Sequence, residues 1–507
     1  MGEEAIWTAV AGRRRLLATI ALASANFMAM LDMSIANVSI PHISGNLGIS
    51  PSQGTWVITS YAVAEAICVP LTGWLAQRFG TLRTFIFCVL GFALFSILCG
   101  LSVTLGMLVV SRIGQGICGG PMIPLTQTLL LRLYPPEKRG QAMGIWAMTT
   151  IIGPVLGPIL GGSISDNLSW HWIFFINVPV AVLCAFSTYE LLRPIETPRI
   201  KLPIDRVGIV LMVIWIGSLQ IMLDIGREHD WFADTTVLLL GIVALVGLIV
   251  FIIWELTEEH PVVDLRVFRY RGFTVGTLTI AMGFSLYFAG IVVIPQWMQL
   301  SLSYTATQAG IATAATGAAS MILARTVPKL MPHIDPRILL SGAFLWIGSA
   351  TLLRINWTSG IDFYHLILPQ AIMGIGMPFF FITATAITLG SVPPAQAASA
   401  AGLQTFVRTI GIAATTSIVM TYWNDEARVS GSELAGKLNT APIEASLTRS
   451  GFQPDQIRVL IAQLVDKEAL TLSTDKIFLI AGLLMWGLSL FVWLAPRPKS
   501  INVQGGH

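Results

Sequence analysis

The chain has 507 residues, of which 54% are hydrophobic and 11% are charged, and its mean hydropathy is +0.74. A soluble globular protein carries about 25% charged residues, so this composition excludes a soluble enzyme or binding domain. It predicts an all-α integral membrane protein. The formal net charge of +3 is too small to indicate a protein that binds nucleic acid.

Fourteen apolar segments are each long enough to cross a membrane as a helix, which takes about 20 residues. In chain order they cover residues 16–41, 55–76, 84–102, 104–131, 141–164, 171–191, 206–224, 235–256, 273–299, 306–328, 337–353, 363–390, 397–422 and 475–495. Short polar turns join most of them. The exception is a longer polar stretch, residues 424–474, which precedes the last segment.

Within that stretch, Pro454–Leu470 is predicted to form an amphipathic helix. Pro454 suits the first turn of a helix, and apolar residues follow at the i, i+3, i+4, i+7, i+8 spacing of one helical face. This apolar stripe consists of Ile457, Leu460, Ile461, Leu464 and Val465.

The basic residues indicate which side of the membrane each turn faces, because cytoplasmic turns carry an excess of Lys and Arg. With a cytoplasmic N-terminus, twenty of the thirty basic residues fall in cytoplasmic segments, and Arg227 and Arg354 fall in short outer loops. Six others lie in or beside residues 424–474, which are too long for the rule to apply. We therefore expect both termini in the cytoplasm and residues 424–474 outside it.

Two glycine-rich strings resemble nucleotide-binding loops without their context. Residues 114–119 fit G-x-G-x-x-G, but they lie inside an apolar segment, whereas a dinucleotide site needs a preceding strand. Residues 431–437 end in Gly-Lys and are followed by Leu438, where a phosphate-binding loop has Ser or Thr. The five cysteines lie in apolar segments without the spacing of metal ligands. We expect no metal and no cofactor.

Four ionisable residues interrupt the apolar segments: Asp32, Glu65, Arg112 and Arg408. A charge at the centre of a membrane costs roughly 3 kcal/mol on insertion scales and usually has a function. Dry surroundings favour the protonated form of a carboxyl group, whereas an adjacent arginine favours the ionised form. Asp32 is therefore the candidate protonation site, Arg112 is its coupling partner, and Glu65 is a possible second acid or cation contact.

The same residues allow structural alternatives. Asp32 and Arg112 would then form a permanent ion pair between the first and fourth predicted helices. Arg408 would pair with backbone carbonyls or with Gln404. Asp224, near the outer end of the seventh segment, is expected to cap a helix or to order the adjoining loop.

The fifth segment combines glycines and prolines at helical spacing. Gly153, Gly157 and Gly161 fall on one face and allow a neighbouring backbone to approach closely. Pro154 and Pro158 remove backbone donors and should bend the helix. We expect this helix to pack tightly and to flex at an interface.

Four motifs in order resemble those of the fourteen-helix drug:proton antiporters of the major facilitator superfamily. They are Leu31–Pro41, Gly73–Arg83, Arg112–Gly116 and Gly153–Gly162. The resemblance covers nearly the whole chain. Three further strings most resemble the inner-membrane pumps of tripartite efflux systems in Gram-negative bacteria, and they are Gln53–Thr59, Trp172–Pro179 and Ser218–Asp224.

The resemblance implies two six-helix bundles with two inserted helices and a substrate cavity between the bundles. The expected divisions are an N-terminal bundle at 1–192, a two-helix insertion at 193–271, a C-terminal bundle at 272–496 and a cytoplasmic tail at 497–507. The candidate cavity residues are Phe27, Asn37, Gln115, Phe284, Tyr287, Phe288, Phe380, Gln404, Phe406 and Arg408. The candidate conformational residues are Gly73, Arg78, Gly80, Arg83, Gly153, Pro154, Gly157, Pro158, Gly161 and Gly162.

The implied function is proton-driven export of hydrophobic or amphiphilic toxic compounds by alternating access, across a bacterial inner membrane. The implied partners are a periplasmic adaptor and, through it, an outer-membrane channel. The apolar stripe either docks that adaptor or folds back on the transporter. Gln77 departs from the superfamily motif, which has Asp at that position. The motif's charged contact between the two bundles on the cytoplasmic side, the latch, is therefore expected to be weaker.

Two other functions compete with export. One is a proton symporter that imports a solute, which the glycines and prolines of the fifth segment disfavour. The other is a membrane-embedded sensor or enzyme, for which the sequence carries neither a soluble catalytic domain nor a nucleophile–base motif. The charge of the substrate stays open, because two acids favour cations and two arginines favour anions.

Overall fold

The computed structural model describes residues 10–49, 51–135, 138–200, 203–226, 231–324, 326–393, 396–438 and 441–496. All regular secondary structure in these ranges is helical, which confirms the predicted fold class. The first half contains α2 (Arg13–Leu47), α3 (Pro51–Cys68), α4 (Thr72–Phe79), α5 (Thr81–Gly100), α6 (Leu105–Leu133), α7 (Arg139–Asn167), α8 (Trp172–Phe175), α9 (Asn177–Leu192) and η2 (Arg193–Ile195).

Two helices follow that pack mainly on each other, α10 (Arg206–Ile225) and α11 (Thr235–Thr257), with η3 (Trp231–Ala233) between them. Only 22% of the apolar stretch of α11 is buried in the protein. An apolar helix with so little protein contact is one that faces lipid. α10 lies against α3 and α17 and so touches both halves of the chain.

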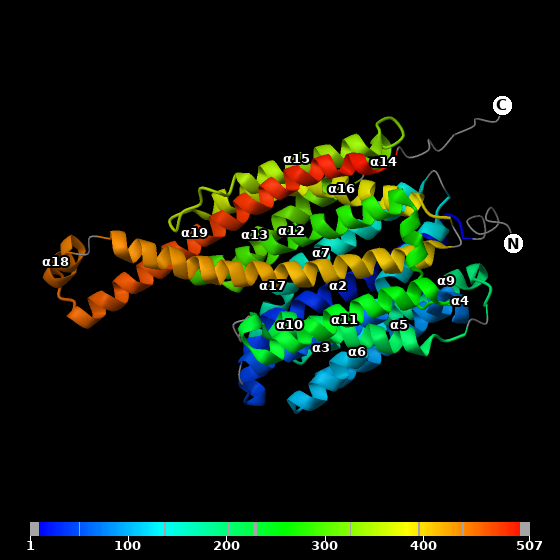
Figure 1. Ribbon diagram of the computed structural model, residues 1–507, viewed down its shortest axis with the longest axis horizontal. Helices are drawn as coiled ribbons and strands as arrows, with labels where there is room; N and C mark the ends of the chain where they lie inside the picture. The colour runs from blue at the N-terminus through cyan, green and yellow to red at the C-terminus, as the bar shows by residue number, and fades with distance from the viewer. Residues whose placement is uncertain are drawn as a thin grey trace.

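The second half contains η4 (Leu265–Arg269), α12 (Arg271–Ser301), α13 (Ala306–Leu323), α14 (Val327–Leu330), α15 (Pro336–Leu352), α16 (Phe363–Gly390), α17 (Ala397–Lys437), α18 (Ala441–Arg449), α19 (Pro454–Phe491) and η6 (Val492–Leu494). The two halves meet along α7, which packs on α13 and α16, and along α17, which packs on α6 and α4. Figure 1 shows the long helices packed side by side with roughly parallel axes.

Nine helices of the described ranges are long and apolar enough to cross a membrane, or up to eleven if each of two bent pairs is one span. Each predicted apolar segment overlaps helical residues. One bend, of 41°, lies between residues 154 and 159 of α7, where the prolines predict it. The other, of 58°, separates α3 from α4 within the single predicted segment 55–76. Pro70, which lacks a backbone donor, lies in that break.

The helix predicted at Pro454–Leu470 is confirmed, because α19 begins at Pro454, but it is not separate from the last predicted span. α17 continues to Lys437, and α19 begins at Pro454 and runs unbroken to Phe491. We call residues 424–474 the projecting hairpin, because with α18 they extend beyond the other helices (Figure 1). Its base is closed by an ion pair of Lys476 with Glu426 and by a hydrogen bond from Trp423 Nε1 to Thr474 Oγ1 at 2.9 Å.

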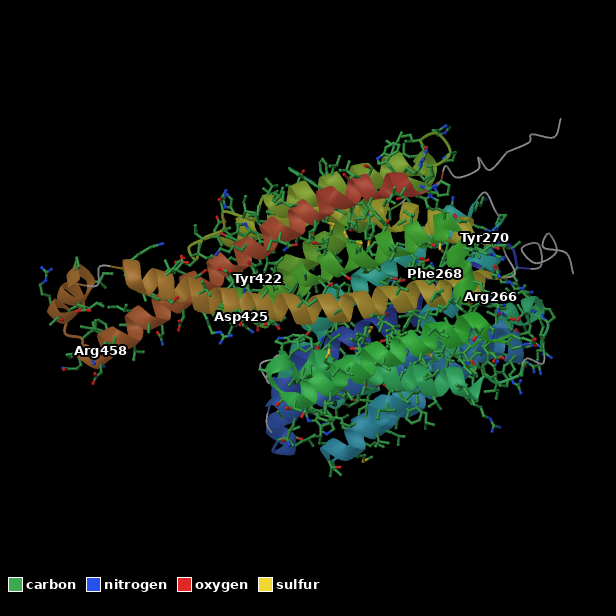
Figure 2. All side chains as sticks on the ribbon, viewed as in Figure 1. Arg266, Phe268, Tyr270, Tyr422, Asp425 and Arg458 are labelled. Atoms are coloured by element: carbon green, nitrogen blue, oxygen red, sulfur yellow. The ribbon has the colours of Figure 1, made fainter. Side chains whose placement is uncertain are left out.

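The projecting hairpin and a basic segment lie at opposite ends of the molecule. In Figure 2, Arg458 lies towards the far end of the projecting hairpin and Asp425 near its base. The basic segment labelled by Arg266 lies at the opposite end. The prediction had placed these two regions on opposite sides of the membrane.

Candidate functional site

The predicted proton-coupling pair is in direct contact in the first half. Asp32 on α2 and Arg112 on α6 are both wholly buried. Arg112 Nη1 donates to Asp32 Oδ2 at 2.6 Å, and Arg112 Nε donates to the Val57 carbonyl at 3.0 Å. The guanidinium also lies 4.2 Å from the centre of the Tyr61 ring. The ion pair is dry, and these extra contacts fix the position of the guanidinium.

The second oxygen of Asp32 is also occupied. Asp32 Oδ1 accepts from Gln115 Nε2 at 3.0 Å and from Asn177 Nδ2 at 2.8 Å. Both amides donate to Ser96 Oγ as well, at 3.1 and 3.2 Å. We call Asp32, Arg112, Gln115, Asn177 and Ser96 the charge cluster. Its carboxylate accepts three hydrogen bonds, from Arg112, Gln115 and Asn177.

The glycines of α7 allow α2 to pack closely against it, and this contact positions Asp32. A Cβ added at Gly153 would lie 2.5 Å from Met30 Cβ, and one at Gly161 would lie 2.8 Å from the Ile35 carbonyl oxygen. The two helices are therefore in backbone contact on either side of Asp32. Pro154 borders the interface with the second half, whereas the side chain of Pro158 lies outside the described residues.

Glu65 and Arg408 approach each other from opposite halves. Glu65 on α3 is 1% exposed, and its Oε2 has no hydrogen-bond partner among the described residues. Arg408 on α17 is 4% exposed and lies 4.9 Å from the Phe284 ring and 5.9 Å from the Trp146 ring. Arg408 Nε likewise has no hydrogen-bond partner among the described residues. The predicted bond between Arg408 and Gln404 is absent from the described residues, and Gln404 Oε1 is itself unpartnered.

Two narrow cavities adjoin each other, mainly among helices of the second half. The first is lined by Pro154 of α7 and by residues of α12, α13 and α16, and the second lies among α12, α15, α16 and α19. Of the predicted cavity residues, Tyr287 borders both. Phe284 and Phe288 stack one turn apart with ring centres 6.0 Å apart, and Phe284 faces Arg408.

The other predicted cavity residues lie elsewhere. Gln115 belongs to the charge cluster, and Phe380 is core, with its ring centre 5.0 Å from that of Phe344. Phe406 packs edge-on against Trp215 of the inserted α10. Asn37 is exposed and donates to the Met33 carbonyl, while Phe27 is half-buried on α2. Aromatic residues serve core and cavity alike, so sequence could not separate them.

The predicted latch residues lie where α4 meets α17. A Cβ added at Gly73 would lie 2.9 Å from Ser399 Cα, so the two halves touch here. Arg78 stacks near the Trp74 ring at 5.4 Å. Gly80 has φ +93°, a conformation that favours glycine. A close contact of Gly310 on α13 with Ile159 of α7, where an added Cβ would lie 2.6 Å from Cγ1, also joins the halves.

Sequence reasoning missed Glu196, which follows η2. Glu196 Oε1 accepts from the Leu82 amide at 3.0 Å, and its Oε2 accepts from the Arg83 amide at 3.1 Å. A carboxylate on the free amides at the start of α5 stabilises that helix end. An acidic group thus stands at this motif although Gln77 replaces the expected Asp.

Two further residues were missed. Asn177 lay within a string noted for its resemblance but received no role, although an asparagine in an apolar segment is itself a signal. Arg354 lies in the turn after α15, the connection predicted to be an outer loop, but its side chain is 1% exposed, which the charge count did not predict. The turn after α15 directs its side chain into the bundle, where Nη2 donates to Gln370 Oε1 at 2.9 Å.

Comparisons with known proteins agree with this geometry. Residues 22–416 match the family model described as Major Facilitator Superfamily. The chain is 43% identical over 502 residues to the multidrug export protein EmrB of Escherichia coli K12, covering 98% of each chain. It is 40% identical over 494 residues to the fatty acid resistance protein FarB of Neisseria gonorrhoeae, covering 96% of this chain and 97% of that protein.

A solved structure shares the fold. It is a bacterial homologue of the human lysosomal transporter Spinster, and the superposition has a TM-score of 0.54 at 14% identity, covering 96% of this chain and all of that one. The family model covers most of the chain and the EmrB match covers nearly all of it, so this protein belongs to the major facilitator superfamily and resembles the EmrB multidrug export proteins.

Proposed function

We propose that this protein is a proton-driven multidrug exporter that removes hydrophobic or amphiphilic compounds from the cytoplasm or the inner leaflet by alternating access. The observation that carries the proposal is the buried ion pair of Asp32 and Arg112, 2.6 Å apart. The names of its relatives, multidrug export and fatty acid resistance, support the class of substrate.

A proton on Asp32 would remove the counter-charge of Arg112. An unpaired buried charge costs several kcal/mol, so the protonated state favours a conformation in which Arg112 is solvated or finds another acceptor. α2 would transmit the change, since it carries Asp32 and is in backbone contact with α7. α7 in turn packs on α13 and α16 of the second half. Proton entry from outside and substrate exit thereby share one conformational cycle.

Glu65 and Arg408 extend this scheme to the second half. Glu65 would act as a second acid or as a contact for cationic substrates, because its Oε2 is free to accept. Arg408 lies between Trp146 of the first half and Phe284 of the second. We assign it to the substrate path.

The proposed topology has fourteen spans, in two six-helix bundles with α10 and α11 inserted, in a bacterial inner membrane with both termini cytoplasmic. The separation of the basic segment at Arg266 from the projecting hairpin supports it (Figure 2). Cysteines introduced at Leu464 and at Arg266 should react with an impermeant reagent from opposite faces. Labelling of both from one face would overturn the topology.

We also propose that the projecting hairpin docks a periplasmic adaptor and thus connects the exporter to an outer-membrane channel. The apolar stripe is only partly free for this, since Ile457 is 3% exposed and Leu464 is 53% exposed. Leu464→Asp should abolish co-purification with the adaptor and leave transport in adaptor-free vesicles intact. Ile457→Asp should destabilise the hairpin itself. If adaptor binding survives Leu464→Asp, the stripe serves only self-packing.

Export is tested in reconstituted vesicles with an imposed pH gradient and a panel of dyes and weak acids. Asp32→Asn keeps the size of the side chain but removes its titration, and we expect it to abolish gradient-driven export, as should Arg112→Ala. Glu255→Gln is the matched control, because Glu255 is a wholly buried carboxylate of the inserted α11. If Asp32→Asn pumps normally, Asp32 is structural and Glu65 becomes the leading candidate.

A further inference from the structure

Arg354 is a buried cation without an acid. Its Nη2 donates to Gln370 Oε1 and lies 3.4 Å from Met373 Sδ, while its Nε has no partner. No carboxylate of the described ranges forms an ion pair with it. Tyr287 borders the second cavity together with Arg354, and the Arg354 carbonyl accepts the backbone N–H of Trp357 at 3.2 Å. A buried guanidinium in this state favours an anion that the chain does not supply.

Two side chains near Arg354, those of Gln370 and Tyr287, also have hydrogen-bond donors without a partner. A guanidinium can only donate, so the amide oxygen of Gln370 must face it, and this turns Gln370 Nε2 away. That nitrogen is buried and unpartnered, as is Tyr287 Oη. Thr316 Oγ1 holds Gln370 in place by donating to its carbonyl at 3.1 Å. Three buried donors with free hydrogens are what a carboxylate, with its four lone-pair directions, accepts from.

These donors border both cavities. Tyr287, Gly290 and Met373 line the two of them, Gln370 lines the first and Arg354 the second. A Cβ added at Gly290 would lie 3.9 Å from Arg354 Nη1, so this glycine leaves the guanidinium open on that side. The remaining walls are mostly apolar and include Ile291, Ile294 and Phe478, and their polar members are Thr313, Thr316 and Thr351. A cavity with a charged group at one side and mostly apolar walls suits a ligand that has a charged end and an apolar body.

We propose that Arg354, Gln370 and Tyr287 form a binding site for the carboxylate of an amphiphilic organic anion, in the second half of the chain. This inference rests on the proposed export function, for which it names a substrate class. Gln370 is seven residues beyond the start of α16 at Phe363, or about 10 Å from that helix end at 1.5 Å per residue. Phe363 follows an outer loop in the proposed topology, so the anion is held in the outer half of the membrane, on the exit path.

Access to this site depends on the interface between the halves. Pro154 of α7 forms one wall of the first cavity, and it lies at the 41° bend of that helix. Movement of α7 away from α13 and α16 widens the cavity beside Tyr287 and Gln370. The apolar body of the ligand then occupies the interface while its carboxylate reaches Arg354.

The test uses the purified full-length protein and 2-naphthoate, with 2-naphthamide as a neutral probe of the same shape, in equilibrium dialysis at fixed salt. Charged hydrogen bonds of this kind are worth about 10- to 100-fold in affinity. Arg354→Gln should weaken naphthoate binding by that factor and leave naphthamide binding unchanged. Arg354→Lys should recover part of the loss, and Tyr287→Phe should cost about threefold. Arg337→Gln is the control, since Arg337 pairs with Asp335 at the other end of α15.

Gly290→Ala fills the space beside the guanidinium without removing a charge, and it should also weaken naphthoate binding. Equal binding of naphthoate to Arg354→Gln and to the parent protein would overturn the site. So would loss of binding in Arg408→Gln alone, which would move the anion to the other buried arginine. Displacement of naphthoate by millimolar chloride would also contradict it, since that indicates an inorganic-anion site.

Failure of the export function is recognised separately. A cationic dye driven by a pH gradient should be exported by the parent protein and by the Arg337→Gln control. If the parent exports nothing under any gradient while naphthoate binding still depends on Arg354, the export proposal fails and the anion site stands. If export is intact but Arg354→Gln binds naphthoate as tightly as the parent protein does, only the proposed anion site is refuted.

Discussion

The two halves of the chain each bury an arginine, but they surround it differently. In the first half, Arg112 donates to Asp32, to Gln115 and to a backbone carbonyl. In the second half, Arg354 has an amide oxygen and a thioether as its acceptors, and its Nε is unpartnered. The same side chain at similar burial is thus neutralised in one half and left charged in the other.

The difference suggests a division of labour. A closed, neutral cluster can change its state by taking up a proton, because one added charge disrupts several hydrogen bonds at once. An open set of donors can instead be completed by a ligand. We therefore associate the first half with the proton and the second half with the substrate, and four measurements test that assignment.

The largest expected effect comes from removing the acid of the first half. Asp32→Asn leaves Arg112 buried without a counter-charge, which typically costs about 3–5 kcal/mol. The thermal unfolding midpoint in detergent, followed by tryptophan fluorescence, should fall strongly. The double variant Asp32→Asn/Arg112→Gln should recover part of this loss, because it removes the uncompensated charge. A single variant as stable as the parent would show that Asp32 is not the counter-ion.

The second-largest effect is expected where helices of one half pack closely on each other, and it should differ between the two halves. Gly161→Ala would bring its Cβ against the backbone oxygen of Ile35, and overpacking of this kind costs about 1–3 kcal/mol. The Cβ of Gly411→Ala on α17 would lie 3.0 Å from the Ser285 hydroxyl, which can rotate away, and 3.7 Å from Ala281, an ordinary van der Waals contact. We expect Gly411→Ala to be neutral or slightly stabilising, from its helix propensity. Equal losses in the two variants would remove this contrast.

The arginine of the second half should respond in the opposite sense. Arg354→Met removes a buried charge that has no acid and fills the space with an apolar chain. Replacement of buried charge by apolar groups is often stabilising, and we expect a gain of about 1 kcal/mol in unfolding free energy. The same fluorescence measurement checks it. A marked loss of stability would mean that Arg354 is structurally required, as Arg112 is.

The smallest effect is expected where the two halves meet. Glu65→Gln keeps the shape of a side chain whose Oε2 has no hydrogen bond, so the unfolding free energy should change by about 0.5 kcal/mol or less. Gradient-driven export should continue at a rate reduced a few-fold. Complete loss of export, with Asp32→Asn still active, would move the main protonation site to Glu65.

The sequence alone determined the helices and the first site. Hydropathy is a local property, so the predicted segments fall on helices. Asp32 and Arg112 could be matched because charges at similar depth in an apolar medium must find each other. The glycines and prolines of α7 predicted both its close packing on α2 and its bend.

Only the tertiary structure decided which faces meet. Asn177 and Ser96 join Asp32 because α9 and α5 turn towards α2, and no spacing in the sequence encodes that rotation. Arg354 points inward because the turn after α15 directs its side chain into the bundle, and counting charges along the sequence could not show that orientation. Residues 424–474 are polar and looked like a loop, yet α17 and α19 extend as helices by packing on each other. Hydropathy is set residue by residue, whereas burial is set by the neighbours that folding supplies.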